Sequence, residues 1–160
     1  MALESAAAPL PAPLLAGVPH LVRRFRLPPP ADLPLLLHAW LLMAVVRLAL
    51  SAMPFGKVCR LFVETSRRGT RGIAVARIVW SAKVASRFVP RATCLTQALV
   101  VQRLLNQSGH PFDLRIGVAG AADGGIEAHA WVESGGVVVI GDPPGASVLE
   151  RYQPIAAWNG

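Results

Sequence analysis

The chain has 160 residues, which is enough for one domain with a modest core and too few for two large ones. Hydrophobic residues make up 53% of it and charged residues 16%, so contact with a membrane or a partner surface has to be considered. The net charge is +7, with the basic residues concentrated in residues 1–110 and an acidic excess in residues 111–160. A basic half can attract nucleic acid, anionic lipid or an acidic peptide. Because zinc-finger spacing and an aromatic platform are both missing, no nucleic-acid partner is expected.

The cysteine count and the first residues bear on the cellular compartment. The chain has two cysteines, Cys59 and Cys94, which make no disulfide framework at this length and fit a reducing cytosol. Residues 1–17 lack a positively charged start and contain Glu4, so they make a poor signal peptide. Two cysteines and scattered histidines give no zinc-ligand spacing, so neither a metal nor a cofactor is expected. The sequence therefore predicts a cytoplasmic protein.

Three segments follow one another along the chain. Residues 1–31 form an arm that is rich in Pro and Ala and carries a basic cluster. Residues 32–90 have the pattern of a helical region, and residues 91–160 that of a helix followed by an antiparallel sheet. We expect residues 32–160 to form one structural domain of the α+β class.

Residues 33–53 form the first predicted helix. Asp32 is a plausible N-cap, and Pro54 ends the run. The segment is apolar and long enough to cross a bilayer, which takes roughly 20 residues. His38 and Arg47 interrupt it, and a charged side chain at mid-membrane costs about 2.5–3.5 kcal/mol even on a mild scale. A core helix or a partner-binding helix is favoured, while membrane association through this segment stays open.

Two further helices are predicted before residue 90. Residues 55–69 have the pattern of a short basic amphipathic helix. Residues 71–88 place apolar side chains at helical spacing, which predicts a helix with one apolar face and one basic face. The positions expected on its apolar side are Ile73, Ala76 or Arg77, Trp80, Val84 and Phe88.

Residues 91–110 carry the clearest helix pattern, with Thr93 as the expected N-cap and Gly109 as the stop. Cys94 would then be the first helical residue. The unpaired N–H groups and the partial positive charge of a helix N-terminus favour a thiolate, which is the nucleophilic form of cysteine. The Cys94 N–H group could also stabilise an oxyanion. The alternative is that Cys94 is a small buried core residue.

From residue 112 onward, apolar and polar residues alternate, which predicts three antiparallel strands. The first runs to about residue 118, and the second and third flank a Ser-Gly-Gly turn near residue 135. The remaining tail is expected to be irregular, with one more turn or an edge strand.

The predicted hairpin brings a histidine and an aspartate together. A two-residue turn at Gly135-Gly136 would pair Ser134 with Val137, and the same register would pair His129 with Asp142. Their Cβ atoms would lie about 4.5–5.5 Å apart on the polar face. A carboxylate there can hold an imidazole by one ring nitrogen and leave the other free to take a proton. A three-residue loop would make the contact diagonal, and a surface pair without a chemical task is the alternative.

Taken together, Cys94, His129 and Asp142 suggest a catalytic triad of a cysteine enzyme. Gln97, one turn after the cysteine, could donate to an oxyanion, although such a residue more often faces solvent. Trp131 shares the face of His129 and could wall the site, and an ordinary packed tryptophan is an equal alternative. Cys59 is expected to be structural. No chemistry is assigned to His20, His38 and His110.

The stretch TCLTQALVVQRLLNQSGHPFDLRIGV, followed by EAHAWVE and then GD, resembles the transglutaminase-like leader peptidases of lasso peptide biosynthesis. The upstream RFVP and LLMAVVRLALSAMPF stretches resemble that family too, so the likeness covers roughly residues 33–145. It implies a papain-like or transglutaminase-like cysteine protease core, with an N-terminal helical region packed near a small antiparallel sheet. The resemblance places the nucleophile at Cys94, the base at His129 and the orienting acid at Asp142.

The resemblance also implies the reaction and its partners. The substrate would be a ribosomally made precursor peptide, cut between leader and core by a stand-alone protease of the B-protein type. A separate small leader-binding protein would present the precursor, and an ATP-dependent lasso cyclase would act on the released core. Two alternatives remain: an acyltransferase on the same fold, and a non-catalytic, membrane-associated scaffold of a peptide-maturation complex.

Overall fold

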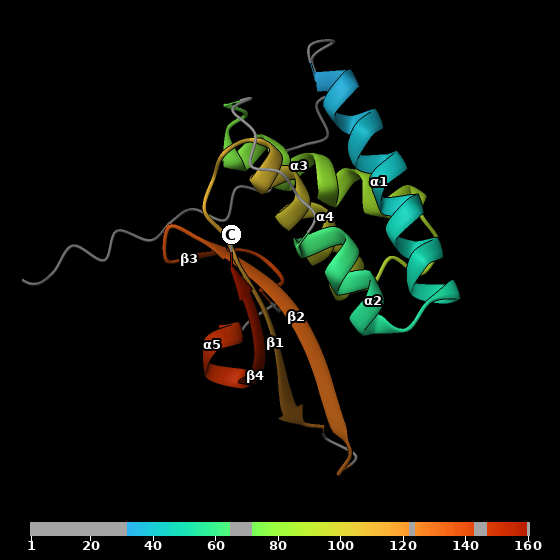
Figure 1. Cartoon of the computed structure of the whole chain (residues 1–160). Coiled ribbons are helices and arrows are strands. Elements are labelled where there is room, and N and C mark those ends of the chain that lie inside the picture. Colours follow the sequence, from blue (N-terminus) through green and yellow to red (C-terminus); the bar gives the residue numbers. More distant parts are fainter. Residues whose placement is uncertain (1–31, 65–71, 122–123, 143–146, 160) are drawn as a thin grey trace, which may run out of the picture.

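The computed structural model describes residues 32–64, 72–121, 124–142 and 147–159. The predicted arm, residues 1–31, and the end of the predicted helix 55–69 lie outside these residues. Figure 1 shows the helices of residues 33–107 gathered at one end of a small sheet, while the short helix at 148–151 lies apart from them beside the sheet and the hairpin of residues 113–134 extends beyond them.

The elements confirm the predicted α+β class. The four strands are antiparallel throughout and lie in the order β3-β2-β1-β4. The predicted tail supplies one helical turn and an edge strand, as expected. The helices are α1 (Leu33–Ala52), α2 (Phe55–Cys59) with its π-helical continuation η2 (Arg60–Glu64), α3 (Val75–Ala85) with the 3₁₀ turn η3 (Ser86–Phe88), α4 (Cys94–Gln107) and α5 (Val148–Arg151); the strands are β1 (Asp113–Gly120), β2 (Ile126–Ser134), β3 (Val137–Ile140) and β4 (Gln153–Asn159).

Helix α1 begins and ends where the sequence predicts, but Asp32 does not cap it through its side chain. The Asp32 carboxylate instead forms an ion pair with Arg77 of α3. An N-cap normally has extended backbone, whereas Asp32 has φ −96° and ψ −10°, which already continues the helix. The side chain therefore links α1 to α3.

Helix α3 is shorter than predicted, and its buried face is a different one. The structure buries Ile78, Ala82 and Ala85, together with Ser81. Of the residues expected to be buried, Ala76 is exposed and Phe88 is 69% exposed. Two apolar faces compete on this helix, and the neighbouring α1 and α4 select the one with small side chains, which permits closer helix packing.

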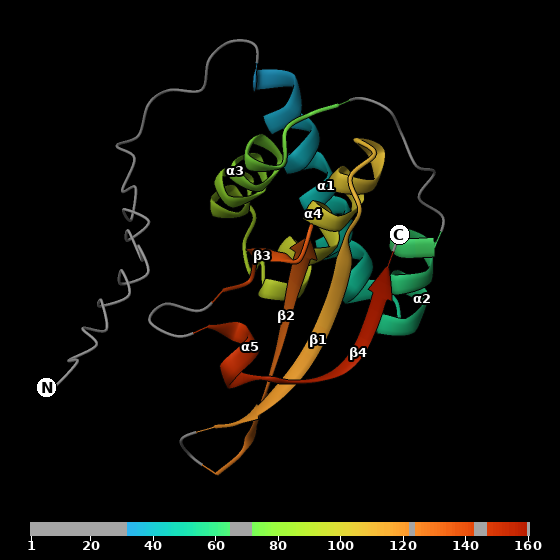
Figure 2. The same cartoon turned by 90° about the vertical axis from the view of Figure 1, so that its left-hand side faces the viewer.

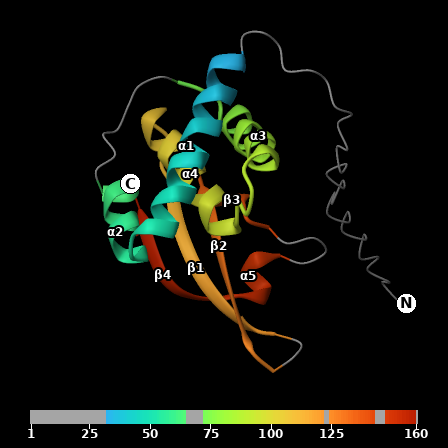
Figure 3. The ribbon, with the colours of Figure 1, turned by 90° about the vertical axis from the view of Figure 1, so that its right-hand side faces the viewer.

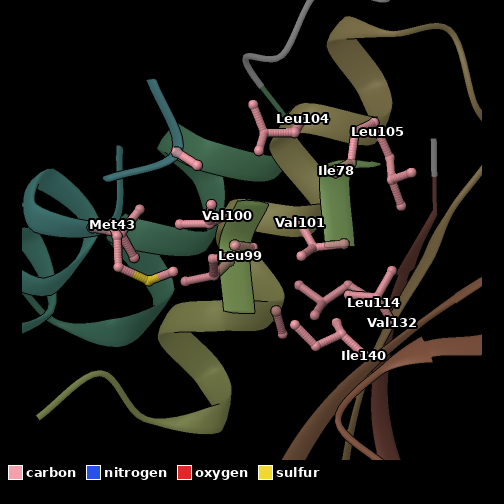
Figure 4. Packing of buried hydrophobic residues seen from close by; sticks show 14 of the residues in the cluster. Met43, Ile78, Leu99, Val100, Val101, Leu104, Leu105, Leu114, Val132 and Ile140 are labelled. Atoms are coloured by element: carbon pink, nitrogen blue, oxygen red, sulfur yellow. The ribbon is translucent and has the colours of Figure 1, made fainter. Parts of the chain in front are cut away.

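One hydrophobic core joins the helices to the sheet. Helix α4 lies between α1, α3 and the sheet, and Leu99 and Leu105 on it are fully buried. The strands contribute from one face only, through residues such as Leu114 and Val132 (Figure 4). Figures 2 and 3 show α1 and α3 covering α4 on the side away from β1 and β2.

The other face of the sheet carries a second, smaller cluster, formed by Trp131, Val148 and Tyr152. Alternate strand residues point to opposite faces, so Trp131 lies on the face opposite the core residues Ala130 and Val132. Val148 of α5 and Tyr152, which directly follows α5, pack here against the indole. This second cluster lies on the same face of β2 as His129.

Candidate active site

Cys94 is the first residue of α4, as predicted. The Thr93 side-chain oxygen accepts a hydrogen bond from the Thr96 N–H group at 3.4 Å, which confirms Thr93 as the N-cap. The Cys94 side chain is half-buried, whereas Cys59 is buried within α2. The more accessible of the two cysteines is therefore the one that the cap places at a helix N-terminus, where backbone N–H groups are unpaired.

His129 lies in the middle of β2, opposite Gly117 of β1 and away from the main core. Its Nε2 atom lies 2.5 Å from the carbonyl oxygen of Gly141. A carbonyl oxygen only accepts hydrogen bonds, so Nε2 carries the proton and donates it. In the neutral ring Nδ1 is then the nitrogen that can accept a proton, which is the tautomer a general base requires.

Gly141 belongs to the candidate site, and sequence reasoning missed it. Its φ of +98° lies in a region that side chains disfavour. A Cβ atom there would lie 2.6 Å from Trp131 Cβ and 2.7 Å from the carbonyl oxygen of Ala130. Only glycine lets the chain cross β2 this closely and bring its carbonyl to His129. The signal in the sequence was the lone glycine directly after the apolar strand VVVI.

The predicted cross-strand pair of His129 and Asp142 is wrong in register. The turn pairs Ser134 with Val137 as expected, but the register then shifts, so that Val132 pairs with Ile140, where β3 ends. Such an irregularity displaces everything beyond it by one residue. Asp142 therefore lies past the strand, and its Oδ1 atom accepts a hydrogen bond from the Val148 N–H group at 2.9 Å.

Tyr152 is the second residue that sequence reasoning missed. Its ring stacks on the His129 imidazole, with the centroids 4.9 Å apart and the planes at 22°. Its hydroxyl group donates to Glu127 Oε1 at 2.9 Å. Burial raises the pKa of Tyr152 above its ordinary value, with further contributions from the Glu127 hydrogen bond and from the charge of Cys94. Helix α4, which begins with Cys94, packs against β2, the strand that carries His129.

The secondary candidates have more ordinary surroundings. Trp131 is fully buried, and its Nε1–H group donates to Glu133 at 2.9 Å, so it is a packed tryptophan that supports Tyr152. Gln97 is half-buried in the first turn of α4, and its oxyanion role stays a prediction. His110 bonds through Nε2 to the carbonyl oxygen of Ile73, at 2.7 Å, and thereby joins the end of α4 to the segment before α3.

Among the residues that the structure describes, no group of three or more His, Cys, Asp and Glu side chains lies close enough together to hold a metal ion.

Helix α1 is the one helix among the described residues that is long and apolar enough to span a membrane. Of its most apolar 18-residue stretch, 22% is buried inside the protein.

Comparison with known proteins gives one clear result. A family model described as the transglutaminase-like superfamily matches residues 42–157, from within α1 to within β4. The match includes Cys94, His129 and Asp142. No curated protein and no solved structure gave a match to this chain.

Proposed function

Since the chain belongs to the transglutaminase-like superfamily, which includes cysteine peptidases and acyltransferases, we propose that it is a cysteine peptidase that removes the leader from a ribosomally synthesised lasso precursor peptide. The observation that carries the cysteine chemistry is the Nε2–H hydrogen bond from His129 to Gly141, because it leaves Nδ1 as the proton acceptor. The lasso substrate rests on the likeness of the TCLTQAL and EAHAW stretches to the leader peptidases of that pathway.

In the proposed mechanism, His129 Nδ1 takes the Cys94 thiol proton, and the thiolate attacks the scissile carbonyl at the leader–core junction. Backbone N–H groups at the start of α4, including that of Cys94, stabilise the oxyanion. The imidazolium then gives its proton to the departing core-peptide amine, and the C–N bond breaks. Water, deprotonated by the neutral imidazole, attacks the thioester and releases the leader's carboxyl group together with the free thiol.

Asp142 is the third residue of the proposed site, and it acts through the neighbouring Gly141. Its carboxylate follows Gly141 directly in the chain and binds the first N–H group of α5. We assign it two tasks: to anchor the Gly141 carbonyl next to His129, and to stabilise the imidazolium through its negative charge. Replacing it by Asn, which keeps the hydrogen-bond acceptor and removes the charge, separates the two.

The partners follow from the same proposal. A separate small leader-binding protein presents the precursor, which raises its local concentration at the site. An ATP-dependent cyclase consumes the released core peptide. The protein acts in the cytoplasm, with peripheral membrane contact through α1. Carbonate washing of membranes tests this contact: release into the soluble fraction is expected, whereas retention supports an inserted scaffold.

The deciding experiment is mass spectrometry of the precursor peptide after incubation with this protein and the leader-binding protein. A single cut at the leader–core junction is expected for the wild type and for Cys59→Ala, and none for Cys94→Ala. Transfer of the leader acyl group to an added amine, with no hydrolysis, would assign the chain to the acyltransferases. An intact precursor in the presence of both folded proteins would favour the scaffold, and a cut that survives Cys94→Ala would exclude Cys94 as the nucleophile.

A further inference from the structure

A tyrosine is the surface on which the His129 imidazole rests. Tyr152 is 3% exposed, and its ring lies nearly parallel to the imidazole, at 22° and 4.9 Å between centroids. Residue 152 is 23 positions from the histidine and belongs to a different element, so this contact is made only by the fold. A ring held in this way limits rotation of the imidazole about its side-chain bonds.

Several contacts hold the Tyr152 ring in place. Its hydroxyl group donates to Glu127 Oε1, and the Arg151 guanidinium binds the other oxygen, Oε2, at 2.8 Å. The same guanidinium carbon lies 5.4 Å from the centre of the Tyr152 ring. The residue also packs in one cluster with Trp131 of β2 and Val148 of α5. The tyrosine is therefore fixed at both its hydroxyl end and its ring.

We propose that Tyr152, held by Glu127, is a positioning residue that keeps the His129 imidazole in its working orientation and stabilises the imidazolium that forms when it takes the Cys94 proton. The inference rests on the proposed cysteine chemistry. A cation over the face of an aromatic ring is attracted by the ring's quadrupole. The hydrogen bond to the Glu127 carboxylate makes the phenol ring richer in electrons, which strengthens that attraction.

The charged and titratable groups of the proposed site come from four parts of the fold. Cys94 lies at the start of α4, Glu127 lies on β2, and Asp142 follows β3. Arg151 and Tyr152 end α5 and lead into β4. Glu127 offsets the Arg151 charge through their ion pair. Tyr152 is the one whose ring stacks on the imidazole, and its phenol is neutral at neutral pH.

The test is the rate at which iodoacetamide alkylates Cys94 in a Cys59→Ala background, measured at about pH 6 and about pH 9. At the lower pH the fraction of Cys94 present as thiolate depends on stabilisation by the imidazolium. At the higher pH the thiolate forms without it. Tyr152→Leu should slow alkylation about three- to tenfold at the lower pH and leave it unchanged at the higher pH. Tyr152→Phe keeps the stacked ring and should retain most of the rate.

Equal rates for Tyr152→Leu and the wild type at the lower pH would overturn the proposal. So would equal slowing of the Leu and Phe variants, because the stack would then not matter. Slowing at both pH values would point to general loss of structure and would also count against it.

A measurement on the unmutated protein is independent of folding defects. The Tyr152 ring current should shift the His129 ring-proton resonances upfield, and unshifted resonances would contradict the stack.

The assay contains no peptide, so it separates this inference from the proposed function. His129→Ala provides the reference. If that variant alters the pH profile and Tyr152→Leu does not, the inference about Tyr152 fails and the Cys94–His129 chemistry stands. If neither variant alters the profile, the cysteine and the histidine do not act together. The inference about Tyr152 and the proposed function then both fail.

Discussion

At the scale of single residues, a backbone carbonyl holds the imidazole where a side-chain acid was expected. The Gly141 oxygen accepts from His129 Nε2, and the carboxylate of the next residue, Asp142, binds α5. A carbonyl fixes the tautomer as an acid would, but it supplies no full negative charge. Under the proposed function, the full negative charge comes from Asp142.

Replacing Gly141 by Ala tests how much this carbonyl matters. The added Cβ atom would overlap Trp131 and the Ala130 carbonyl, and φ is +98°. We expect the free energy of unfolding to fall by about 1–3 kcal/mol. Peptide cleavage should slow at least about tenfold, because the carbonyl would move away from His129. Gly124→Ala is the matched control, because Gly124 has φ +82° with no atom near its Cβ position. Equal losses of cleavage in both variants would show that backbone strain alone is responsible.

Tyr152 is the chain's single tyrosine, so its titration can be followed alone. Burial and the hydrogen bond to Glu127 raise its pKa above 10.0, and a raised pKa means that the folded protein binds this proton more tightly than the unfolded chain does. Stability should therefore be constant below about pH 10 and fall as the pH rises through the folded value. Tyrosinate absorbance and denaturant unfolding measure the two effects, and a midpoint at or below 10 would contradict the burial.

At the scale of elements, α1 has two apolar faces with different surroundings. Leu35, Ala39, Met43 and Val46 face the core, and Leu48 on the other side is 69% exposed. The remaining exposed apolar residues of this helix are Leu33, Leu37, Trp40, Leu41 and Val45. A run of this kind exceeds the isolated apolar residues that are normal on a surface, so it can drive association.

Substitutions on the two faces should differ in their effect on the free energy of unfolding. Met43→Ala opens a cavity in the core and should lower the free energy of unfolding by about 2–5 kcal/mol. Leu37→Gln with Leu48→Gln should change it by less than about 0.5 kcal/mol each and reduce self-association and vesicle binding. Thermal unfolding and co-sedimentation with vesicles measure these outcomes. Strong destabilisation by the Gln pair would mean that the outer face is buried after all.

At the scale of the whole molecule, one core connects the helical part to the sheet. Met43 of α1, Leu99 of α4 and Val132 of β2 belong to the same cluster of buried side chains (Figure 4). Neither the helices nor the sheet has a separate core large enough to stand alone, because small domains bury little surface. If residues 32–160 form one domain, as expected, the helices and the sheet should unfold together in one cooperative transition.

Leu99→Ala tests that cooperativity. Leu99 is fully buried, and its truncation should lower the free energy of unfolding by about 2–5 kcal/mol. Helical circular dichroism and the fluorescence of Trp131, isolated by replacing the other three tryptophans with Phe, should lose their signals at one shared denaturant midpoint, before and after the substitution. Two separate midpoints would show that helices and sheet unfold as independent units.

Local chemistry was enough to determine several features of this chain. The Thr93 cap, the start of α4 at Cys94 and the Gly135-Gly136 turn follow from residues within a few positions of one another, and each is confirmed. The alternation of β2 placed His129 on the face away from the main core. Caps and turns depend on neighbouring backbone groups, so the sequence alone contains their cause.

Tertiary contacts decided the rest. The buried face of α3 depends on which neighbour packs against it, and the register shift between β2 and β3 removes Asp142 from the predicted pairing with His129. Tyr152 reaches His129 only because α5 folds back over the second cluster. Each of these contacts joins residues that are distant in sequence. Such contacts stabilise the protein only once the elements pack together, so a local sequence pattern cannot predict them.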